Sequence, residues 1–368
     1  MQNKKNVDKI FLGLIIALIA VGVIMFTSAS LGILAKNESK FYGVIFNQFA
    51  FGLLGGGIAL CLALRIPYKF WREYSLALFI GSILLTLLVF VPHIGFAHGG
   101  ARRWINIFGV SIQPVEFLKI AFIIYFAAWL SWVKGKVRDV KFSLVPLIIL
   151  LGLIAVVLLK QPDTKSLILI ASTALVMLFV SGTSWKYILG FLTVSIIGFI
   201  VLAMFTPYLQ KRVDTFLHPS HDPSGSSYQL QQSLIAIGSG GLLGRGIGQS
   251  IQKFNYLPEP QGDSIFAVVG EEVGFIGCVV LIALFLAFTF RGYKIAYYAP
   301  DSFSKLFVIG ILTLFTAQAF MNIASIIGVF PLTGVPLPFI SHGGTALLIT
   351  LGTMGIVLNI SQYQKKIS

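Results

Sequence analysis

The residues in this sequence best suited to chemistry are a few carboxylates set among apolar segments. Asp263 closes a proline-containing segment that begins at residue 255, and a long apolar run follows it directly. A carboxylate in that place can cap the helix that follows, because its oxygens accept backbone N–H bonds. It can also act as a general base, because partial desolvation at a membrane boundary raises its pKa. Capping and catalysis do not exclude each other, so both interpretations stay open.

Further charged residues lie within or beside other apolar runs. Glu271 and Glu272 fall about two turns into the run after Asp263, where a carboxylate costs several kcal/mol unless it is paired. Glu116 and Lys119 are three residues apart and can share one helix face, which supports an ion pair and a ligand site equally. Asp163 precedes another apolar run and is interpreted as a helix cap.

Two segments rich in glycine or proline predict irregular backbone close to these charges. The run 238–248 lacks the G-x-G-x-x-G spacing and the Lys-Ser/Thr pair of nucleotide-binding loops. We therefore interpret it as backbone that turns tightly or approaches a ligand closely. Residues 328–344 combine prolines with glycines, and non-helical backbone at membrane depth is tolerated only where it is buried in protein or lines a polar cavity.

Membrane spans must position these residues. Of the 368 residues, 57% are hydrophobic and only 11% are charged, whereas roughly a quarter of a soluble domain is charged. Apolar stretches of ~20 residues, each able to cross ~30 Å of hydrocarbon, recur along the chain. The sequence predicts an all-α integral membrane protein, one polytopic domain over residues 1–368. Its ten spans lie at roughly 10–31, 44–64, 74–92, 114–133, 144–159, 166–182, 187–206, 264–290, 304–327 and 342–361.

The basic residues predict the orientation of these spans. The net charge of +14 does not indicate nucleic acid, because most basic residues lie in short loops between apolar runs. About 16 of the 27 fall on the side that carries both termini, so we expect both termini in the cytoplasm. The outward residues oppose this bias and need another explanation; they are Arg102, Arg103, Lys160, Lys165, Lys211, Arg212, Arg245 and Lys253. For Lys165 and Lys253 we favour solvated surface charge.

One outward connection, about residues 207–263, is far longer than the others, and loops of such length are usually functional or disordered. It is not of low complexity. Leu230, Leu234 and Ile237 fall on one helical face, which predicts a short helix at the membrane surface with its apolar side down.

Polar groups gathered at the outer ends of spans favour an enzyme that acts on a lipid-linked substrate. A transporter would place them near mid-bilayer and often shows inverted repeats, and no internal repeat is evident. Carboxylates there suit proton transfer, and cations suit a phosphate-bearing lipid.

Several motifs, in order along nearly the whole chain, resemble the signatures of the SEDS family (FtsW, RodA, SpoVE). They are GARRWI at 100–105 with QPVEFLK at 113–119, QPD at 161–163, YQLQQS at 228–233, LPE at 257–259 with Asp263 and EEVGF at 271–275, and PLPFISHGG at 336–344.

The resemblance implies a ten-span peptidoglycan glycosyltransferase of the bacterial cytoplasmic membrane, which polymerises lipid II at the outer face. Asp263 matches the family's essential acid and would take the proton from the acceptor sugar hydroxyl. Arg102 and Lys119 are our candidates for stabilising the pyrophosphate that leaves. We also expect contacts with substrate from Glu116, Gln229, Gln232, Ser233, Glu259, Ser341 and His342. A structural polar network would comprise Asp163, Glu271, Glu272 and Arg103.

The sequence departs from the family pattern in three places. The usual QPDLGT reads QPDTKS at 161–166, which adds the charge of Lys165. The usual AHTDF or QHTDF becomes PQGDS at 260–264, so the acid remains but its neighbours differ, and the usual SYGG becomes SHGG at 341–344. The segments 252–258 and 216–223 look closer to the division type, FtsW, than to the elongation type, RodA.

The same resemblance implies a set of partners: a class B penicillin-binding protein as transpeptidase, lipid II, the growing glycan strand, other divisome proteins and membrane lipids. No nucleic acid is expected. A divalent cation, Mg²⁺ or Mn²⁺, could share the stabilisation of the pyrophosphate. For the lone His342 we favour structural hydrogen bonding over metal ligation, and His218, His221 and Asp222 form at most a weak metal site. The alternatives are a RodA-like polymerase of the same reaction, a lipid II flippase and a division scaffold.

Overall fold

The fold is known from a computed structural model, which describes residues 6–98, 101–107, 110–218 and 226–364. The first half contains α1 (Lys9–Leu34), α2 (Glu38–Phe46), the π-helix η1 (Asn47–Gly55), α3 (Gly56–Arg65), α4 (Tyr68–Glu73), α5 (Ser75–Leu87), the 3₁₀ helix η2 (Leu88–Phe90), β1 (Gly95–His98), β2 (Ala101–Ile107), β3 (Val110–Ile112), α6 (Pro114–Val133), α7 (Val140–Lys160) and α8 (Thr164–Ser181). The second half contains α9 (Trp185–Phe205), α10 (Pro207–Leu217), α11 (Ser226–Ser239), α12 (Ile265–Tyr297), α13 (Ser302–Ile326) and α14 (Gly344–Ser361).

Each predicted span has a helical counterpart within the described residues. Nine helical segments there are long and apolar enough to cross a membrane, with α2, η1 and α3 forming one continuous segment, Glu38–Arg65. The counterpart of the span predicted at 74–92 is a shorter apolar helix, Ser75–Phe90. The prediction of a multi-pass helical membrane protein is confirmed, with nine spans of full length rather than ten.

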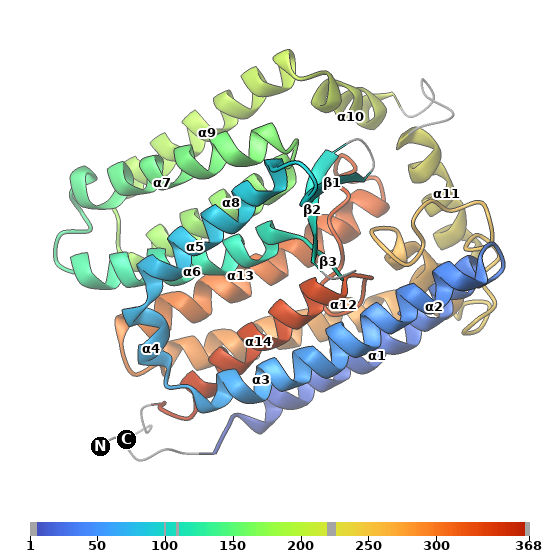
Figure 1. The fold of residues 1–368 in the computed structure, drawn as a ribbon, viewed down its shortest axis with the longest axis horizontal. Coiled ribbons are helices and arrows are strands. Elements are labelled where there is room, and N and C mark those ends of the chain that lie inside the picture. Colours follow the sequence, from blue (N-terminus) through green and yellow to red (C-terminus); the bar gives the residue numbers. More distant parts are fainter. Residues whose placement is uncertain (1–5, 99–100, 108–109, 219–225, 365–368) are drawn as a thin grey trace.

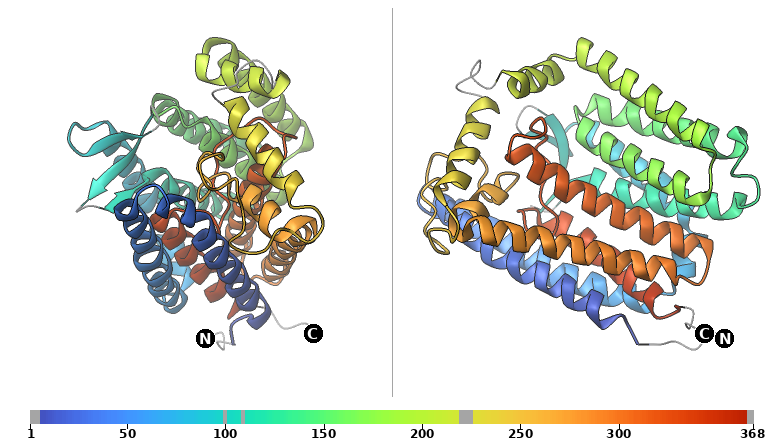
Figure 2. Two further views of the ribbon diagram at one scale, coloured as in Figure 1. Left: turned by 90° about the vertical axis from the view of Figure 1, so that its right-hand side faces the viewer. Right: turned by 180° about the vertical axis from the view of Figure 1, so that it is seen from behind.

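The helices run roughly side by side, so the molecule has two distinct ends (Figure 1). α1 begins and α14 ends at one of them, on the left of Figure 1. The sheet, α10, α11 and the loop that leads into α12 lie at the opposite end, and the rear view shows the same separation (Figure 2). The candidate residues that the sequence placed outside therefore gather at the end away from the termini.

A small antiparallel sheet, which the sequence did not predict, accompanies the helices of this all-α membrane fold. Its strands follow the order β1-β2-β3. Along β2, Ala101 and Ile105 are buried while Arg102 and Asn106 are exposed, which is the alternation of a strand with one covered face. The alternation covers only a few residues between two long apolar stretches, so the sequence did not indicate the strands.

The longest helix, α12, is broken near its start by Gly274, whose φ of 72° and ψ of −170° are not helical. The break frees backbone groups that an apolar environment cannot satisfy. The glycine-rich loop satisfies them: Arg245 N and Gly246 N donate to the carbonyls of Glu271 and Glu272, each at 3.0 Å. In the other direction, Phe275 N and Ile276 N donate to the carbonyls of Gly241 and Leu242 at 2.9 and 3.2 Å.

This contact explains the glycine run. A β-carbon on Gly240 would lie 2.0 Å from the Gly270 carbonyl oxygen, and one on Gly244 would lie 2.2 Å from that of Glu272. Gly244 also has a φ of 79°, which other residues rarely adopt. The prediction of tightly turned backbone is confirmed, and the close approach in the structure is to α12. Close approach to a ligand stays a prediction.

The two carboxylates beside the break are fully paired. Glu272 Oε1 lies 2.7 Å from Lys253 Nζ, and Glu272 also accepts from Ser28 Oγ at 2.6 Å. Glu271 accepts from Ser250 Oγ at 2.6 Å and from Ile251 N at 3.0 Å. Lys253 is only 1% exposed, so its interpretation as a solvated charge is wrong: it is the partner that permits Glu272 to be buried.

The helix predicted in the long loop exists as α11, but the face that it buries differs from the prediction. Leu230 and Ala236 are buried, together with Ser233, whereas Leu234 is 45% exposed. α11 packs against α12, so one face of α11 is buried in the protein and only the opposite face is left for the membrane surface.

We expect Gly244→Ala to destabilise the protein by about 2 kcal/mol or more, because a left-handed backbone and a clash with the Glu272 carbonyl combine. The matched control is Gly238→Ala in α11, where a β-carbon meets nothing within 4 Å and where alanine favours the helix. Thermal unfolding of both variants in detergent measures the difference. Equal melting temperatures would contradict this account of the glycine loop.

Candidate active site

Asp263 lies at the end of the long loop, just before α12, and its side chain is half-buried. The cap residue of α12 is Ser264, so Asp263 is not engaged as the helix cap that its position suggested. Gln229 Nε2 on α11 donates to Asp263 Oδ1 at 3.3 Å and to Ser264 Oγ at 2.9 Å. The backbone carbonyl of Asp263 accepts from Asn322 Nδ2 at 2.7 Å. Asp263 is therefore held through its carboxylate by α11 and through its backbone by α13.

Burial raises the pKa of Asp263 above its ordinary value. The positive charge of Lys165 opposes that rise, and the negative charge of Glu259 adds to it. The Gln229 hydrogen bond and the positive charge of Arg212 also favour the ionised form. The net direction is upward, which is the direction a general base requires.

Two cations face this carboxylate across Gly334. The point where a β-carbon on Gly334 would lie is 3.2 Å from Asp263 Oδ2, 3.6 Å from a guanidinium nitrogen of Arg212 and 3.9 Å from Lys165 Nζ. The three charged groups therefore converge on one small volume, brought there by α8, α10 and the start of α12. Gly334 has a φ of 62°, and any side chain at this position would enter that volume.

Neither cation has a carboxylate as its hydrogen-bond partner among the described contacts of this site. Lys165 Nζ donates to the backbone carbonyl of Gly334, and Arg212 donates to that of Leu332. The Arg212 guanidinium also lies 4.6 Å from the centre of the Tyr208 ring. Since a carbonyl is neutral, these hydrogen bonds do not cancel the charge of either cation. The carboxylates of Asp163 and Asp263 act on Lys165 electrostatically, and that of Asp263 acts on Arg212.

A third cation, Arg103, adds to this positive region from the hairpin. Burial lowers the pKa of Arg212, and the charges of Tyr208 and Asp263 oppose that effect. The positive charge of Arg103 lowers the pKa of Arg212 further, so Arg103 is within electrostatic range of Arg212. Arg103 Nε donates to the Gln161 carbonyl at 3.1 Å, and its guanidinium also bonds to that of Pro162. It thereby ties β2 to the turn before α8, as expected for a member of the structural network.

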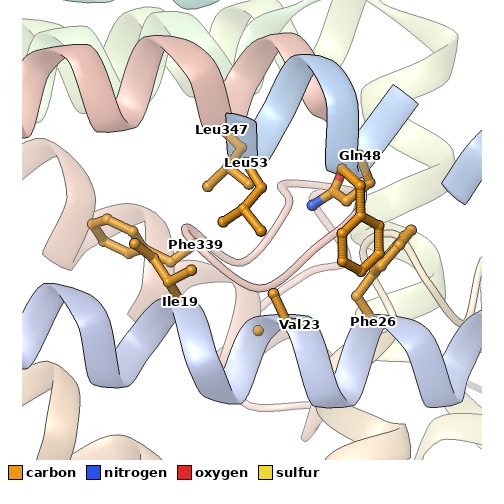
Figure 3. A pocket seen from close by; sticks show the side chains of 9 residues that line it. Ile19, Val23, Phe26, Gln48, Leu53, Phe339 and Leu347 are labelled. Carbon is orange, nitrogen blue, oxygen red and sulfur yellow. The ribbon is translucent and has the colours of Figure 1, made fainter. Parts of the chain in front are cut away.

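The segment 327–343 forms the non-helical wall that the prolines predicted, and polar side chains anchor it from several helices. Asn322 Nδ2 donates to the Val335 carbonyl at 2.7 Å. Ser341 Oγ donates to the Gly262 carbonyl at 2.7 Å and accepts from Leu337 N at 2.8 Å. Gln48, which lies above the turn in Figure 3, accepts from Gly343 N at 2.9 Å. Gln48 belongs to the π-helix η1, a type of irregularity frequent at functional sites.

His342 follows the same turn. Its backbone N–H donates to the Gln261 carbonyl at 2.7 Å, and its ring stacks on Phe26 with centroids 5.9 Å apart. Burial lowers the pKa of His342 to about 4, so the imidazole is neutral at physiological pH. It supports the loop before Asp263 through its backbone, and its side chain packs against α1.

The pair Glu116 and Lys119 forms the ion pair that the spacing allowed, with 2.9 Å between Lys119 Nζ and Glu116 Oε2. Lys119 is 3% exposed and also donates to Gln318 Oε1 at 3.3 Å. Gln318 in turn donates to the Pro336 carbonyl at 3.0 Å. Lys119 therefore supports the non-helical wall indirectly, through Gln318 and the Pro336 carbonyl.

The predicted residues thus fall into three groups. Asp263, Glu259, Gln229, Ser341 and His342 come together around the loop before α12. Glu116, Lys119, Arg103, Asp163, Glu271 and Glu272 lie in supporting contacts; Asp163 caps α8 and accepts from Ser166 Oγ at 2.8 Å. Arg102 is exposed on β2, Gln232 is half-buried, and Ser233 Oγ donates to the Gln229 carbonyl within α11.

The sequence-based interpretation missed Lys165 and Arg212 as members of the site. For Lys165 the signal was present, because a lysine two residues after Asp163 departs from the QPDLGT pattern. Its interpretation as a solvated charge is wrong. Arg212 had no such signal, because only the fold of α10 over this end brings it to Gly334.

Among the described residues, no three His, Cys, Asp or Glu side chains are grouped so as to hold a metal ion. His218 contacts Asp214 at 3.1 Å, while His221 and Asp222 lie outside the described residues. The groups around Asp263 are chiefly cations and amides, a donor set unsuited to a cation site built by protein alone. A divalent ion held by substrate phosphates stays a prediction.

Comparisons with known proteins show the family and the fold of the chain. The family model "Cell cycle protein", which covers FtsW, RodA and SpoVE, matches residues 8–366. A probable peptidoglycan glycosyltransferase FtsW of Geobacter metallireducens is 39% identical over 365 residues, which is 99% of this chain and 97% of the relative. A solved chain of a peptidoglycan synthase complex that coordinates polymerization and crosslinking has a TM-score of 0.79 and 27% identity, covering 96% of this chain and 97% of its own. The rod shape determining protein RodA of Thermus thermophilus gives a TM-score of 0.70 and 25% identity, with 98% of both chains covered.

The raised pKa of Asp263 leads to a prediction for stability. The folded carboxyl keeps its proton to a higher pH than the unfolded chain does, where the value is about 3.9. Ionisation therefore costs stability as the pH rises through the window between those two pKa values. We expect Asp263→Asn to raise the melting temperature by roughly 1–3 °C at pH 7.5.

The gain should be smaller at pH 4 than at pH 7.5, because the raised pKa of the folded Asp263 carboxyl leaves more of it protonated at the lower pH. Thermal scans of the wild type and Asp263→Asn at both pH values measure the difference in melting temperature. A variant that melts below the wild type at pH 7.5 would show that the ionised carboxylate stabilises the fold.

Proposed function

Because the chain belongs to the FtsW, RodA and SpoVE family of cell cycle proteins, we propose that it is a peptidoglycan glycosyltransferase that polymerises lipid II. The observation that carries this proposal is the convergence of Asp263, Lys165 and Arg212 around Gly334. A carboxylate beside two cations that donate only to backbone carbonyls suits a reaction that needs both a base and a site for a departing pyrophosphate.

In the proposed reaction, Asp263 takes the proton from the acceptor sugar hydroxyl. The oxygen then attacks the anomeric carbon of the donor, a new C–O bond forms, and the bond to the pyrophosphate breaks. Undecaprenyl pyrophosphate leaves with the electron pair of the broken bond. Burial and Glu259 raise the pKa of Asp263 and so strengthen it as a base, while Gln229 keeps the carboxylate aimed.

Lys165 and Arg212 are the groups we propose for stabilising the leaving pyrophosphate. Both cations converge with Asp263 on Gly334. Of the two earlier candidates, Lys119 is neutralised by Glu116 and Arg102 is exposed on β2. Guanidinium and ammonium donors bind phosphate oxygens through charge-assisted hydrogen bonds. Lys119 then acts indirectly through the wall that contains Pro336.

We further propose that the end with the site faces outward and that both termini face the cytoplasm. The distribution of basic residues supports this orientation, because most of them fall in the loops on the side of the termini. Ten membrane crossings follow if Ser75–Phe90 spans the bilayer despite its length. The substrate, lipid II, would then be met at the outer face.

A class B penicillin-binding protein is the partner we propose, with other divisome proteins. The support is the similarity to a chain of a peptidoglycan synthase complex. The FtsW relative favours septal synthesis over an elongation role. A flippase would need polar groups along the membrane interior, whereas the charged groups of this site lie at one end of the helices.

We expect Asp263→Ala to lower polymerisation of labelled lipid II by about 10²–10⁴-fold, because the base is removed. The assay uses purified protein together with its penicillin-binding partner and measures glycan strands on gels. Equal strand yields from wild type and variant would exclude Asp263 as the base. No strands from either would favour the flippase or the scaffold.

We expect Lys165→Met to lower the turnover rate by roughly 10–100-fold, because one donor to the leaving pyrophosphate is lost. Lys160→Met is the matched control: it removes the same charge from an exposed position at the end of α7. The two variants are compared in the same strand assay at saturating lipid II. Equal losses would mean that general surface charge, rather than Lys165 itself, matters.

A further inference from the structure

A second polar cavity opens close to the site, on the side of α1 and α2. Its volume is about 440 Å³, within the range typical of ligand sites. The end of α1 and the connection to α2 form one wall, Tyr228 of α11 contributes, and the loop 253–261 forms the opposite wall. None of these lining residues belongs to the group around Gly334.

The walls of this cavity suit an anionic, hydroxyl-rich ligand. Lys36 and Lys40 stand at the connection of α1 and α2 and supply two positive charges. Asn37, Asn255 and the phenol groups of Tyr228 and Tyr256 supply hydrogen-bonding groups. Lys36 and Lys40 are exposed, so an incoming phosphate would meet them at the rim.

Deeper in the cavity, one buried group is left without a partner. Gln261 is 9% exposed, and its side-chain oxygen Oε1 has no hydrogen-bond partner among the described residues. Its amide nitrogen donates to Glu259 Oε2 at 3.3 Å. A buried polar atom without a partner costs about 1–3 kcal/mol. Because Oε1 is enclosed by protein atoms, a ligand hydroxyl relieves that cost only after the Gln261 side chain turns toward the cavity.

The wall formed by residues 259–261 also connects the cavity to Asp263. Glu259 lines the cavity and is close enough to Asp263 to affect that carboxylate electrostatically. At this end of the molecule α10 lies on one side of α11 and α2 on the other (Figure 1). The cations Lys165 and Arg212 and the cations Lys36 and Lys40 therefore approach the loop before α12 from different sides.

We propose that this cavity binds the saccharide–pyrophosphate head of the acceptor lipid, while the donor pyrophosphate lies against Lys165 and Arg212. This assignment rests on the proposed function, because only a polymerase needs two lipid-linked saccharides at once. The acceptor hydroxyl gives its proton to Asp263 and its oxygen bonds to the donor's anomeric carbon. The donor's pyrophosphate keeps the electrons of the broken bond, and the acceptor's own pyrophosphate stays intact at Lys36 and Lys40.

The test uses the full chain with Lys36→Glu and Lys40→Glu together, and Lys36→Arg with Lys40→Arg as the charge-conserving variant. Lys160→Glu is the control for an added negative charge at the same end. In the strand assay we expect the glutamate variant to raise the KM for lipid II about tenfold or more with kcat changed far less. The arginine variant and the Lys160 control should stay near wild type. A glutamate variant with the wild-type KM would overturn the proposal.

A binding measurement separates this inference from the proposed function. With Asp263→Ala, which cannot turn over, fluorescent lipid II should bind at two sites per protein in nanodiscs, and adding the two glutamate substitutions should leave one. Suppose that the glutamate substitutions remove one binding site but the wild-type chain makes no glycan strands. The cavity would then be a lipid II site, and its role as the acceptor site would be excluded. Two sites in both proteins would overturn the cavity assignment.

Competition identifies the ligand chemistry. We expect unlabelled lipid II to displace the probe from the cavity, and undecaprenyl pyrophosphate to do so more weakly, because it lacks the sugars that would meet the polar side chains lining the cavity. Phosphatidylglycerol should displace it poorly. Equal displacement by phosphatidylglycerol would show a general site for anionic lipid headgroups and would overturn the assignment to the acceptor.

Discussion

The break in α12 at Gly274 is the constraint on which the outer end of the molecule depends. A helix that opens in apolar surroundings must find partners for its freed N–H and C=O groups. The loop 240–246 supplies them through backbone bonds in both directions, which is possible only because glycines allow the two backbones to touch. Fixing that loop fixes the chain that follows it. Asp263 lies at the end of this loop, just before α12, and the loop itself is hydrogen-bonded to α12.

The buried charged residues at this end are of two kinds: ion pairs that hold loops in place, and cations that could bind a ligand. Glu272 with Lys253, and Glu116 with Lys119, are neutralised pairs at 2.7 and 2.9 Å. Such pairs cost desolvation energy and lock loops in place, but they offer nothing to a ligand. Lys165 and Arg212 instead donate to neutral backbone carbonyls of the segment 327–343. Neither is in a direct ion pair among these contacts, so their donors can turn to a phosphate without breaking one.

Hydropathy could predict the spans because each one must be apolar for about 20 residues, a signal that local context cannot hide. Asp263 could be found only through the resemblance, since its spacing fits a helix cap equally well. Lys253 was misjudged because its partner Glu272 lies 19 positions away and meets it only through the folded loop. Arg212 was missed for the same reason. Pairings made by the fold of a long loop leave no periodic trace in a sequence.

The loop before α12 combines a rigid anchor with a strained turn, and this combination suits a wall shared by two sites. Gly32 of α1 packs so closely that a β-carbon there would lie 2.2 Å from the Lys253 carbonyl oxygen. A few residues later Asn255 and Glu259 adopt positive φ values of 89° and 45°, which are costly for residues other than glycine. Since Lys253 is held by Glu272 and the segment after the turn by Ser341, the strain between them cannot relax by sliding the chain. The turn therefore keeps Glu259 and Gln261 directed to one side of the loop while Asp263 faces Gly334.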